Sequence, residues 1–175
     1  MFATENLVRA LGSFMEDMWI PLEDSYGLID QDVKNSMIDQ LKLKAEFKAC
    51  VEDPGFDWIK LASDAQLLIS PNDYSNLEIC NYVKSLLQDY LYPEHTMSET
   101  DIQKLYVDII NILKDFSDSE GWMGSYPLYE ILISNKEYMD FDYYNLWKLD
   151  FARDIERKPI PGKDREIGYL RYKVN

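Results

Sequence analysis

The chain has 175 residues and a formal net charge of −14, because 32 acidic residues outnumber 18 lysines and arginines. Such a surface repels nucleic acid and anionic membranes and attracts basic partners. A hydrophobic fraction of 46% with only 7 Gly and 7 Pro excludes a disordered chain and favours a compact, mainly α-helical, bundle-like fold over a turn-rich β sandwich. We expect one domain over residues 1–175.

Apolar residues at helical spacing predict four main helices, over residues 5–19, 31–51, 74–91 and 99–116, and a shorter one over 57–68. Thr4 is the predicted N-cap of the first helix and Ser98, with Asp101, of the fourth. The apolar stripes that should face the core are Val33, Met37, Ile38, Leu41 and Ala45; Leu77, Cys80, Val83, Leu87 and Tyr90; and Ile102, Leu105, Tyr106, Ile109, Ile112, Leu113 and Phe116.

The pattern changes after residue 116. Residues 118–125 contain two glycines and predict a loop, and residues 127–134 and 142–155 are predicted to be helical. A turn at 159–162 opens a C-terminal arm, residues 159–175. Within this arm, apolar and polar residues alternate over 167–174, which predicts a short β-strand or an extended segment. We expect any strand of this protein to lie in the arm.

Charge is unevenly distributed along the chain. Residues 153–175 contain seven basic and four acidic residues, a net charge of +3, and residues 1–152 therefore carry −17. No apolar run approaches the ~20 residues that span a bilayer, and the N-terminus does not have the pattern of a secretory signal. We therefore expect a cytoplasmic protein that binds neither membrane nor nucleic acid.

The residues that usually carry chemistry do not form a recognisable site. His95 is the single histidine, and it lies in a polar turn. Cys50 and Cys80 lie in apolar helical patterns, which favours two buried thiols, although a disulfide between them stays open. The sequence contains no metal-ligand spacing and no phosphate-binding or nucleophile motif. We expect no catalytic residue, no cofactor and no metal, and hence a protein that is not an enzyme.

The segment from Asp115 to Asp154 combines acids with aromatic rings. Adjacent rings such as Tyr143 and Tyr144 cannot all face one side of a helix, so some should be exposed among carboxylates. Such a surface suits lysine and arginine side chains through ion pairs and cation–π contacts. The predicted partner-binding residues are Asp118, Glu120, Trp122, Tyr126, Glu137, Tyr138, Asp140, Asp142 and Tyr143.

With its small size, strong acidity and acidic-aromatic segment, the chain resembles the bacterial immunity proteins of toxin–immunity pairs, particularly those of contact-dependent growth inhibition. This resemblance extends over the whole chain, but it is one of kind, because these proteins share no motif from which individual residues could be transferred. It implies a cytoplasmic toxin inhibitor, an antitoxin that binds the basic nuclease domain of one cognate toxin and blocks its active site.

Two other functions agree with the same composition. One is an acidic mimic of nucleic acid that inhibits a nucleic-acid-binding protein, which would need carboxylates spaced like phosphates. The other is an enzyme or small-ligand-binding protein with a site of scattered carboxylates and tyrosines, which would need a deep pocket. The sequence leaves the identity of the partner and the oligomeric state open.

Overall fold

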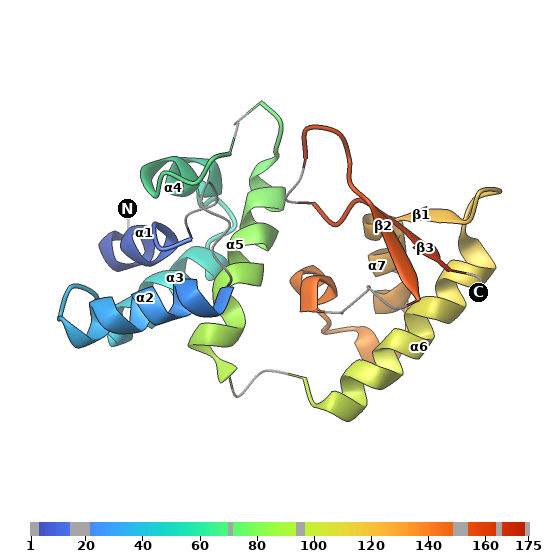
Figure 1. Ribbon diagram of the computed structural model, residues 1–175, viewed down its shortest axis with the longest axis horizontal. Helices are drawn as coiled ribbons and strands as arrows, with labels where there is room; N and C mark the ends of the chain where they lie inside the picture. The colour runs from blue at the N-terminus through green and yellow to red at the C-terminus, as the bar shows by residue number, and fades with distance from the viewer. Residues whose placement is uncertain are drawn as a thin grey trace. The chain divides into compact units, whose positions relative to one another are not determined.

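The computed structural model describes residues 4–14, 22–69, 72–93, 97–148, 154–163 and 166–173 (Figure 1). The fold is mainly α-helical with short strands near the C-terminus, as the apolar pattern predicts. It divides into two compact units, Met1–Leu91 and Tyr92–Asn175. The single domain over residues 1–175 stays a prediction.

Unit 1 consists of helices that pack their apolar sides into one core. Its completely buried side chains include Leu7, Phe47 and Leu87, and burying each such side chain contributes roughly 1.5–3 kcal/mol. The helices that supply them are α1 (Glu5–Leu11), α2 (Leu22–Lys34), α3 (Gln40–Glu52), α4 (Trp58–Asp64) and α5 (Asn76–Leu91).

The helix predicted over residues 31–51 is in fact the end of α2 and all of α3. Ser36 adopts a positive φ of 58° after the end of α2, and Asp39 caps α3 by accepting hydrogen bonds from the N–H groups of Leu41 and Lys42. This break resets the phase of the apolar stripe. Met37 and Leu41 are therefore exposed, Leu41 to 81%, while α3 buries Leu43, Phe47 and Cys50.

The helices predicted over residues 5–19 and 74–91 also differ from the structure. The first ends at Leu11, with Gly12 as its C-cap residue, and residues 15–19 of its predicted span lie outside the described residues. The predicted N-cap residue Thr4 precedes α1 but forms no side-chain capping hydrogen bond. In α5, Val83 and Leu87 are buried as predicted, but Leu77, in the first turn of the helix, is 61% exposed and Ile79 is buried.

Two groups of unit 1, the buried Cys50 thiol and the partly buried Tyr82 hydroxyl, should make its stability sensitive to alkaline pH. Burial, with smaller contributions from Glu46 and Asp53, raises the pKa of the Cys50 thiol from 9.0 to about 12. Burial likewise raises the pKa of Tyr82 from 10.0 to about 12. The folded state holds both protons more tightly than the unfolded chain, so this stabilisation is complete below pH 9 and is lost as the pH rises towards about 12.

We therefore expect the free energy of unfolding, measured with urea, to fall steadily above pH 9. Tyr82→Phe should make the fall shallower above pH 10, because phenylalanine has no proton to lose. A free energy of unfolding that stays constant across this range in the wild-type protein would contradict the raised pKa of both groups.

Unit 2 contains a long helix, a shorter helix and a small sheet. Helix α6 (Glu99–Phe116) agrees with the predicted bounds, and Ser98 caps it by accepting a hydrogen bond from the N–H of Asp101. The elements that follow are β1 (Trp122–Gly124), α7 (Ser125–Ser134), the 3-10 helices η3 (Lys136–Tyr138) and η4 (Tyr143–Lys148), β2 (Ile155–Lys158) and β3 (Tyr169–Tyr172).

The sheet is antiparallel with strand order β1-β3-β2. Strand β3 confirms the predicted C-terminal strand, but β1 lies in the predicted loop and β2 precedes the arm, so the prediction that strands are confined to the arm is wrong. One face of the sheet buries Met123, Ile155 and Leu170 against a core that α6 and α7 complete with Leu105, Ile109, Leu113, Leu128 and Leu132. This core holds α6 beside α7 and η3.

Gly168, just before β3, is a glycine that the fold requires. Its φ is +78°, and a Cβ atom there would lie 2.5 Å from the carbonyl oxygen of Lys158 in the neighbouring strand. Gly162 has the same φ of +78° but open space around it. The two positions thus share one backbone conformation and differ in steric contact.

We expect Gly162→Ala to lower the free energy of unfolding by about 1–2 kcal/mol, the cost of the left-handed conformation. Gly168→Ala should cost a further ~1–3 kcal/mol, because strand β2 must move away from the methyl group. Chemical denaturation followed by circular dichroism measures both. Equal losses for the two variants would show that β2 does not approach Gly168 so closely.

Candidate partner-binding site

The nine residues predicted to bind a partner fall into three groups, apart from the exposed Asp142. The first group surrounds β1. The exposed Asp118 carboxylate accepts hydrogen bonds from the backbone N–H groups of Glu120, at 2.9 Å, and Trp122, at 2.8 Å. Asp118 therefore holds the turn that leads into the sheet, which is a local structural role of a kind common for aspartate.

The ring of Trp122 already has cations of the same chain over it. The Arg171 guanidinium carbon lies 4.5 Å from the ring centroid and Lys158 Nζ lies 5.5 Å from it. Arg171 faces Trp122 across the β1–β3 pair and also forms an ion pair with Glu156 of β2. Trp122 as a partner-binding residue stays a prediction, and the ring already makes cation–π contacts within the chain.

The second group belongs to the core. Tyr143 is only 5% exposed; its ring stacks on that of Tyr126 with 4.4 Å between centroids, and its hydroxyl lies 2.8 Å from Ser125 Oγ. Tyr129 packs edge-on against the same ring. Tyr143 is therefore a core residue and not an exposed anchor, and Tyr126 is half-buried beside it.

The third group, Glu137, Tyr138 and Asp140, lines a surface groove beside α6. Asn135 caps η3 by accepting a hydrogen bond from the N–H of Glu137 at 3.1 Å. This cap starts a tight turn directly after α7 and directs Tyr138 back towards α6. Tyr138 is buried, and its hydroxyl donates a hydrogen bond to Asp108 Oδ2 at 2.6 Å. Burial, followed by this hydrogen bond, raises the pKa of Tyr138 well above its ordinary value.

The groove consists of two hollows that share Tyr138 as a wall. One has a volume of about 420 Å³ and is lined by Met97, Asp101, Lys104, Glu137, Tyr138, Asp140, Phe141 and Asn145. The other has a volume of about 290 Å³ and is lined by Asp108, Asn111, Ile112, Asp115, Phe116, Ile131, Leu132, Ser134, Asn135 and Tyr138. We call these two hollows together the α6 groove.

Acidic groups dominate the charge of the α6 groove. Five carboxylates line it, while the single lysine among its lining residues, Lys104, forms an ion pair with Glu137. Asp101, Glu137, Asp140 and Asp115 are exposed, and Asp108 is half-buried. Because these carboxylates remain in contact with water, the groove can attract a cationic side chain without a large cost of desolvating a buried charge.

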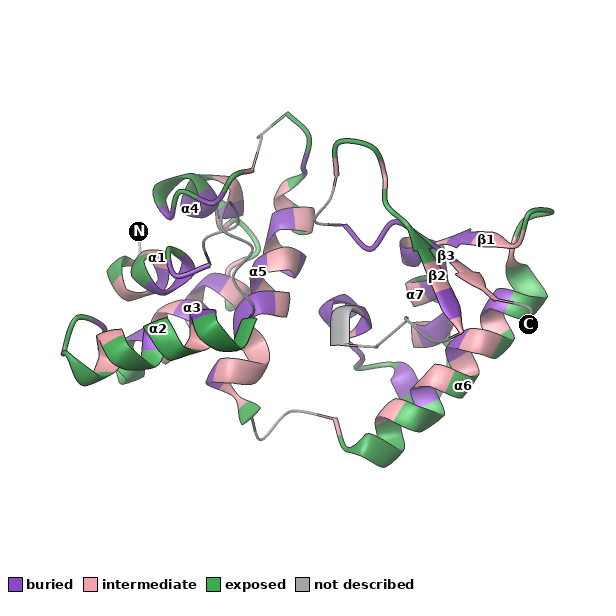
Figure 2. Cartoon of the chain, viewed as in Figure 1, coloured by how far each residue is buried: buried purple, intermediate pink, exposed green. Residues whose placement is uncertain are grey.

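The α6 groove also presents apolar surface. Phe116, at the end of α6, is 61% exposed and lines the second hollow. Along α6, exposed positions lie among buried and half-buried ones (Figure 2). Phe116 was predicted to face the core. Its side chain is instead exposed, because Phe116 is the last residue of α6.

The predicted partner-binding residues do not include Asp101, Asp108 or Asp115, which line the groove. Asp101 and Asp108 lie on α6 before the acidic-aromatic segment 115–154, and with Asp115 they are spaced at intervals of seven residues. That spacing places them near one side of a helix and was a usable signal.

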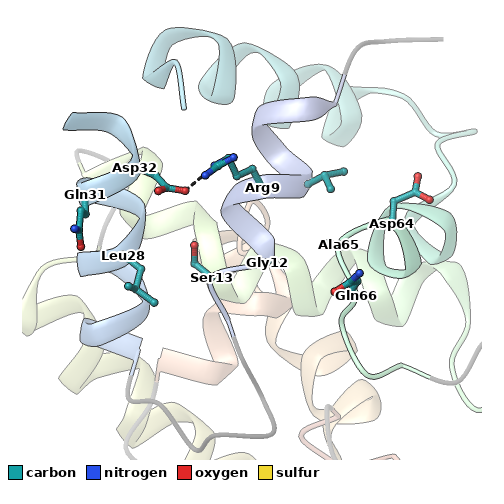
Figure 3. A pocket seen from close by; sticks show the side chains of 10 residues that line it. Arg9, Gly12, Ser13, Leu28, Gln31, Asp32, Asp64, Ala65 and Gln66 are labelled. Atoms are coloured by element: carbon teal, nitrogen blue, oxygen red, sulfur yellow. Dashed lines mark hydrogen bonds and ion pairs between the residues drawn. The ribbon is translucent and has the colours of Figure 1, made fainter. Parts of the chain in front are cut away.

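Unit 1 has a separate hollow of about 390 Å³ between α1, α2 and the end of α4 (Figure 3). Its most prominent charged group, Arg9, donates a hydrogen bond to Asp32 at 2.7 Å. The other lining groups include Ser13, Asp64 and Gln66. Since the Arg9 guanidinium is already paired with Asp32, this hollow attracts a charged ligand less strongly than the α6 groove does.

Cys50, Cys80 and His95 are the cysteine and histidine side chains of this sequence, and these residue types can take part in metal or redox chemistry. Cys50 and Cys80 are both thiols rather than a disulfide. His95 lies outside the described residues. Among the residues that the structure describes, no three His, Cys, Asp or Glu side chains are placed to hold a metal ion. No described helix combines the length and the apolar character needed to cross a membrane.

No family model, no curated protein and no solved structure shows significant similarity to the chain. The groove and its charge are therefore the features of the molecule that bear on its function.

Proposed function

We propose that this chain is an acidic binding protein that neutralises a basic protein partner in the cytoplasm. The observation that carries the proposal is the α6 groove, where five carboxylates and the exposed Phe116 ring surround two adjoining hollows. Cationic side chains gain from the carboxylates, and apolar side chains gain from the rings. Interfaces combine these two features when the partner is basic.

The most specific form of the proposal is an immunity protein that blocks the active site of a cognate nuclease toxin. A nuclease site must attract phosphates and is therefore electropositive, so an acidic inhibitor competes with nucleic acid for the same field. Complementary charge raises association rates about 10–10³-fold. A cell that contains an active toxin needs this speed, since the toxin acts until it is bound.

The charge distribution supports a partner that meets unit 2 on one side. Residues 92–152 contain twelve acidic and four basic residues, whereas residues 153–175 are net basic. The sheet places Lys158 and Arg171 away from the buried face that Leu170 shares with the core. A basic partner is therefore favoured at the α6 groove and disfavoured at the sheet.

The test uses the protein domain that is encoded next to this chain in its genome. We expect that domain to stop growth when produced alone, and growth to recover when this chain is produced with it. The purified pair should form a complex, and one equivalent of this chain should abolish cleavage of nucleic acid by the domain.

Three outcomes would count against the proposal. A neighbouring domain that is harmless or is not bound removes the immunity function. Binding of a small molecule in the hollow beside Arg9, with no effect on any basic protein, would favour the small-ligand alternative. Inhibition of many unrelated nucleic-acid-binding proteins would favour a nucleic-acid mimic, because a mimic recognises what such proteins share.

A further inference from the structure

The α6 groove contains a regular spacing of charge. Asp101, Asp108 and Asp115 lie seven residues apart on α6. Seven residues are almost two turns of an α-helix, so these carboxylates drift by only ~20° per interval and are about 10.5 Å apart along the axis. Asp101 lines the first hollow, and Asp108 and Asp115 line the second. The three carboxylates thus follow the whole length of the groove.

Apolar side chains lie between and beside these carboxylates. Met97 and Phe141 line the first hollow, and Ile112, Phe116 and Ile131 line the second. Tyr138 lines both hollows, and its hydrogen bond to Asp108 fixes the position of the middle carboxylate. A bound partner segment must therefore place apolar groups against these apolar side chains and cations at intervals of about 10.5 Å along the three carboxylates.

This interval distinguishes a helical occupant from an extended one. In a β-strand, side chains on one face recur at about 6.8 Å and 13.6 Å, and those separated by about 10 Å point to opposite faces. In an α-helix parallel to α6, side chains at every seventh position recur at about 10.5 Å on one face, beside apolar positions three and four residues away. The spacing of the carboxylates fits the helix.

We propose that the α6 groove binds an amphipathic α-helix of its partner that carries lysine or arginine at every seventh position. The proposal rests on the proposed function and deepens it, because it names the part of the basic partner that enters the groove. The distance from Asp101 to Phe116 corresponds to about 22 Å of helix, so the bound segment is about four turns long. This is the recognition mode in which a helix places its apolar side into a groove.

The first part of the test uses the full chain and three alanine-rich peptides of about 18 residues and identical charge, followed by fluorescence anisotropy. One peptide carries lysine at every seventh position with leucines on the same side. The second has the same composition with lysine at every fifth position, which scatters the charges around the helix. The third is the first peptide with a central proline. We expect the first to bind about tenfold more tightly than either of the others.

The second part changes the protein. Asp115→Asn and Phe116→Ser should each weaken binding of the first peptide by about three- to tenfold, because one removes a carboxylate and the other an exposed ring. Glu130→Gln is the matched control, since Glu130 is exposed on α7 and does not line the groove. Circular dichroism of each variant establishes that it is folded.

Equal affinity for the three peptides, absence of binding at low salt, or no effect of the two groove variants would each overturn the helical occupant. None of these results would overturn the proposed function by itself, because a basic domain could still be bound and neutralised through another surface. Conversely, a neighbouring domain that is not bound would end the proposed function, whatever the peptides do.

Discussion

Tyr143→Ala should lower the free energy of unfolding of this protein by about 3–5 kcal/mol, the usual cost of truncating a large aromatic residue in a core. The ring is stacked on Tyr126, meets Tyr129 edge-on and is almost completely excluded from solvent. Its removal leaves a cavity that the neighbouring rings cannot fill without losing their own contacts. Because domains have a total stability of only about 5–15 kcal/mol, unit 2 should unfold at a much lower temperature.

Two companion variants separate the ring from its hydroxyl group. Tyr143→Phe retains the packing and leaves Ser125 Oγ without its 2.8 Å partner, which should cost about 1–3 kcal/mol. Tyr169→Ala truncates a tyrosine that is 44% exposed on β3 and should cost less than Tyr143→Ala. Thermal melts of the free protein measure all three. If Tyr143→Ala melts at the same temperature as the wild-type protein, Tyr143 is not a core residue and would again be a candidate for partner binding.

Helix α6 shows what local sequence could predict. Its stripe, with Leu105, Ile109 and Leu113 facing the core, continues over five turns, and a serine cap precedes it. All this information is contained within one continuous segment. The prediction of one helix over residues 31–51 was wrong because the sequence spacing of Met37 and Leu41 continues the apolar stripe of α2. The turn at Ser36 ends that helix, and both side chains are exposed.

The sheet could not be predicted in the same way. Strand β1 has three residues and β2 has four, too few for alternation to be recognised. Each becomes a strand because it pairs with β3, which lies far along the chain from β1, as the pair Trp122 and Arg171 shows. Pairing of this kind depends on the tertiary fold, and sheet stability comes from cross-strand contacts rather than from local propensity.

The candidate site was predicted only in part for the same physical reason. Acidity and aromatic density indicated the segment from 115 to 154, and Glu137, Tyr138 and Asp140 do lie together in the α6 groove. Which rings are buried depends on partners such as Ser125 for Tyr143 and Arg171 for Trp122. Composition carries no information about these pairings, so it could not separate the core rings from exposed ones.

The rate at which this protein associates with its basic partner should fall about 10–10³-fold between low and high salt. Steering requires charges of one sign on the side that meets the partner, and the α6 groove provides five carboxylates there. The Debye length falls from about 30 Å at 0.01 M to about 3 Å at 1 M ionic strength. At the higher value, carboxylates about 10.5 Å apart along α6 no longer act together on an approaching cation. Stopped-flow mixing at several salt concentrations measures the effect.

Two double variants with the same net charge test whether the position of the charge matters. Asp101→Asn with Asp115→Asn removes two carboxylates from the groove, and Asp73→Asn with Glu130→Gln removes two exposed carboxylates elsewhere. The amide oxygen that Asp101→Asn introduces can still accept the hydrogen bond that the Ser98 hydroxyl donates to Asp101 Oδ2 at 2.6 Å. The groove pair should slow association and flatten its dependence on salt more than the other pair does. Equal effects would mean that net charge steers the partner and that the groove has no special part in the encounter. A rate that does not depend on salt would remove electrostatic steering altogether, and the apolar surface around Phe116 would then have to account for binding by itself.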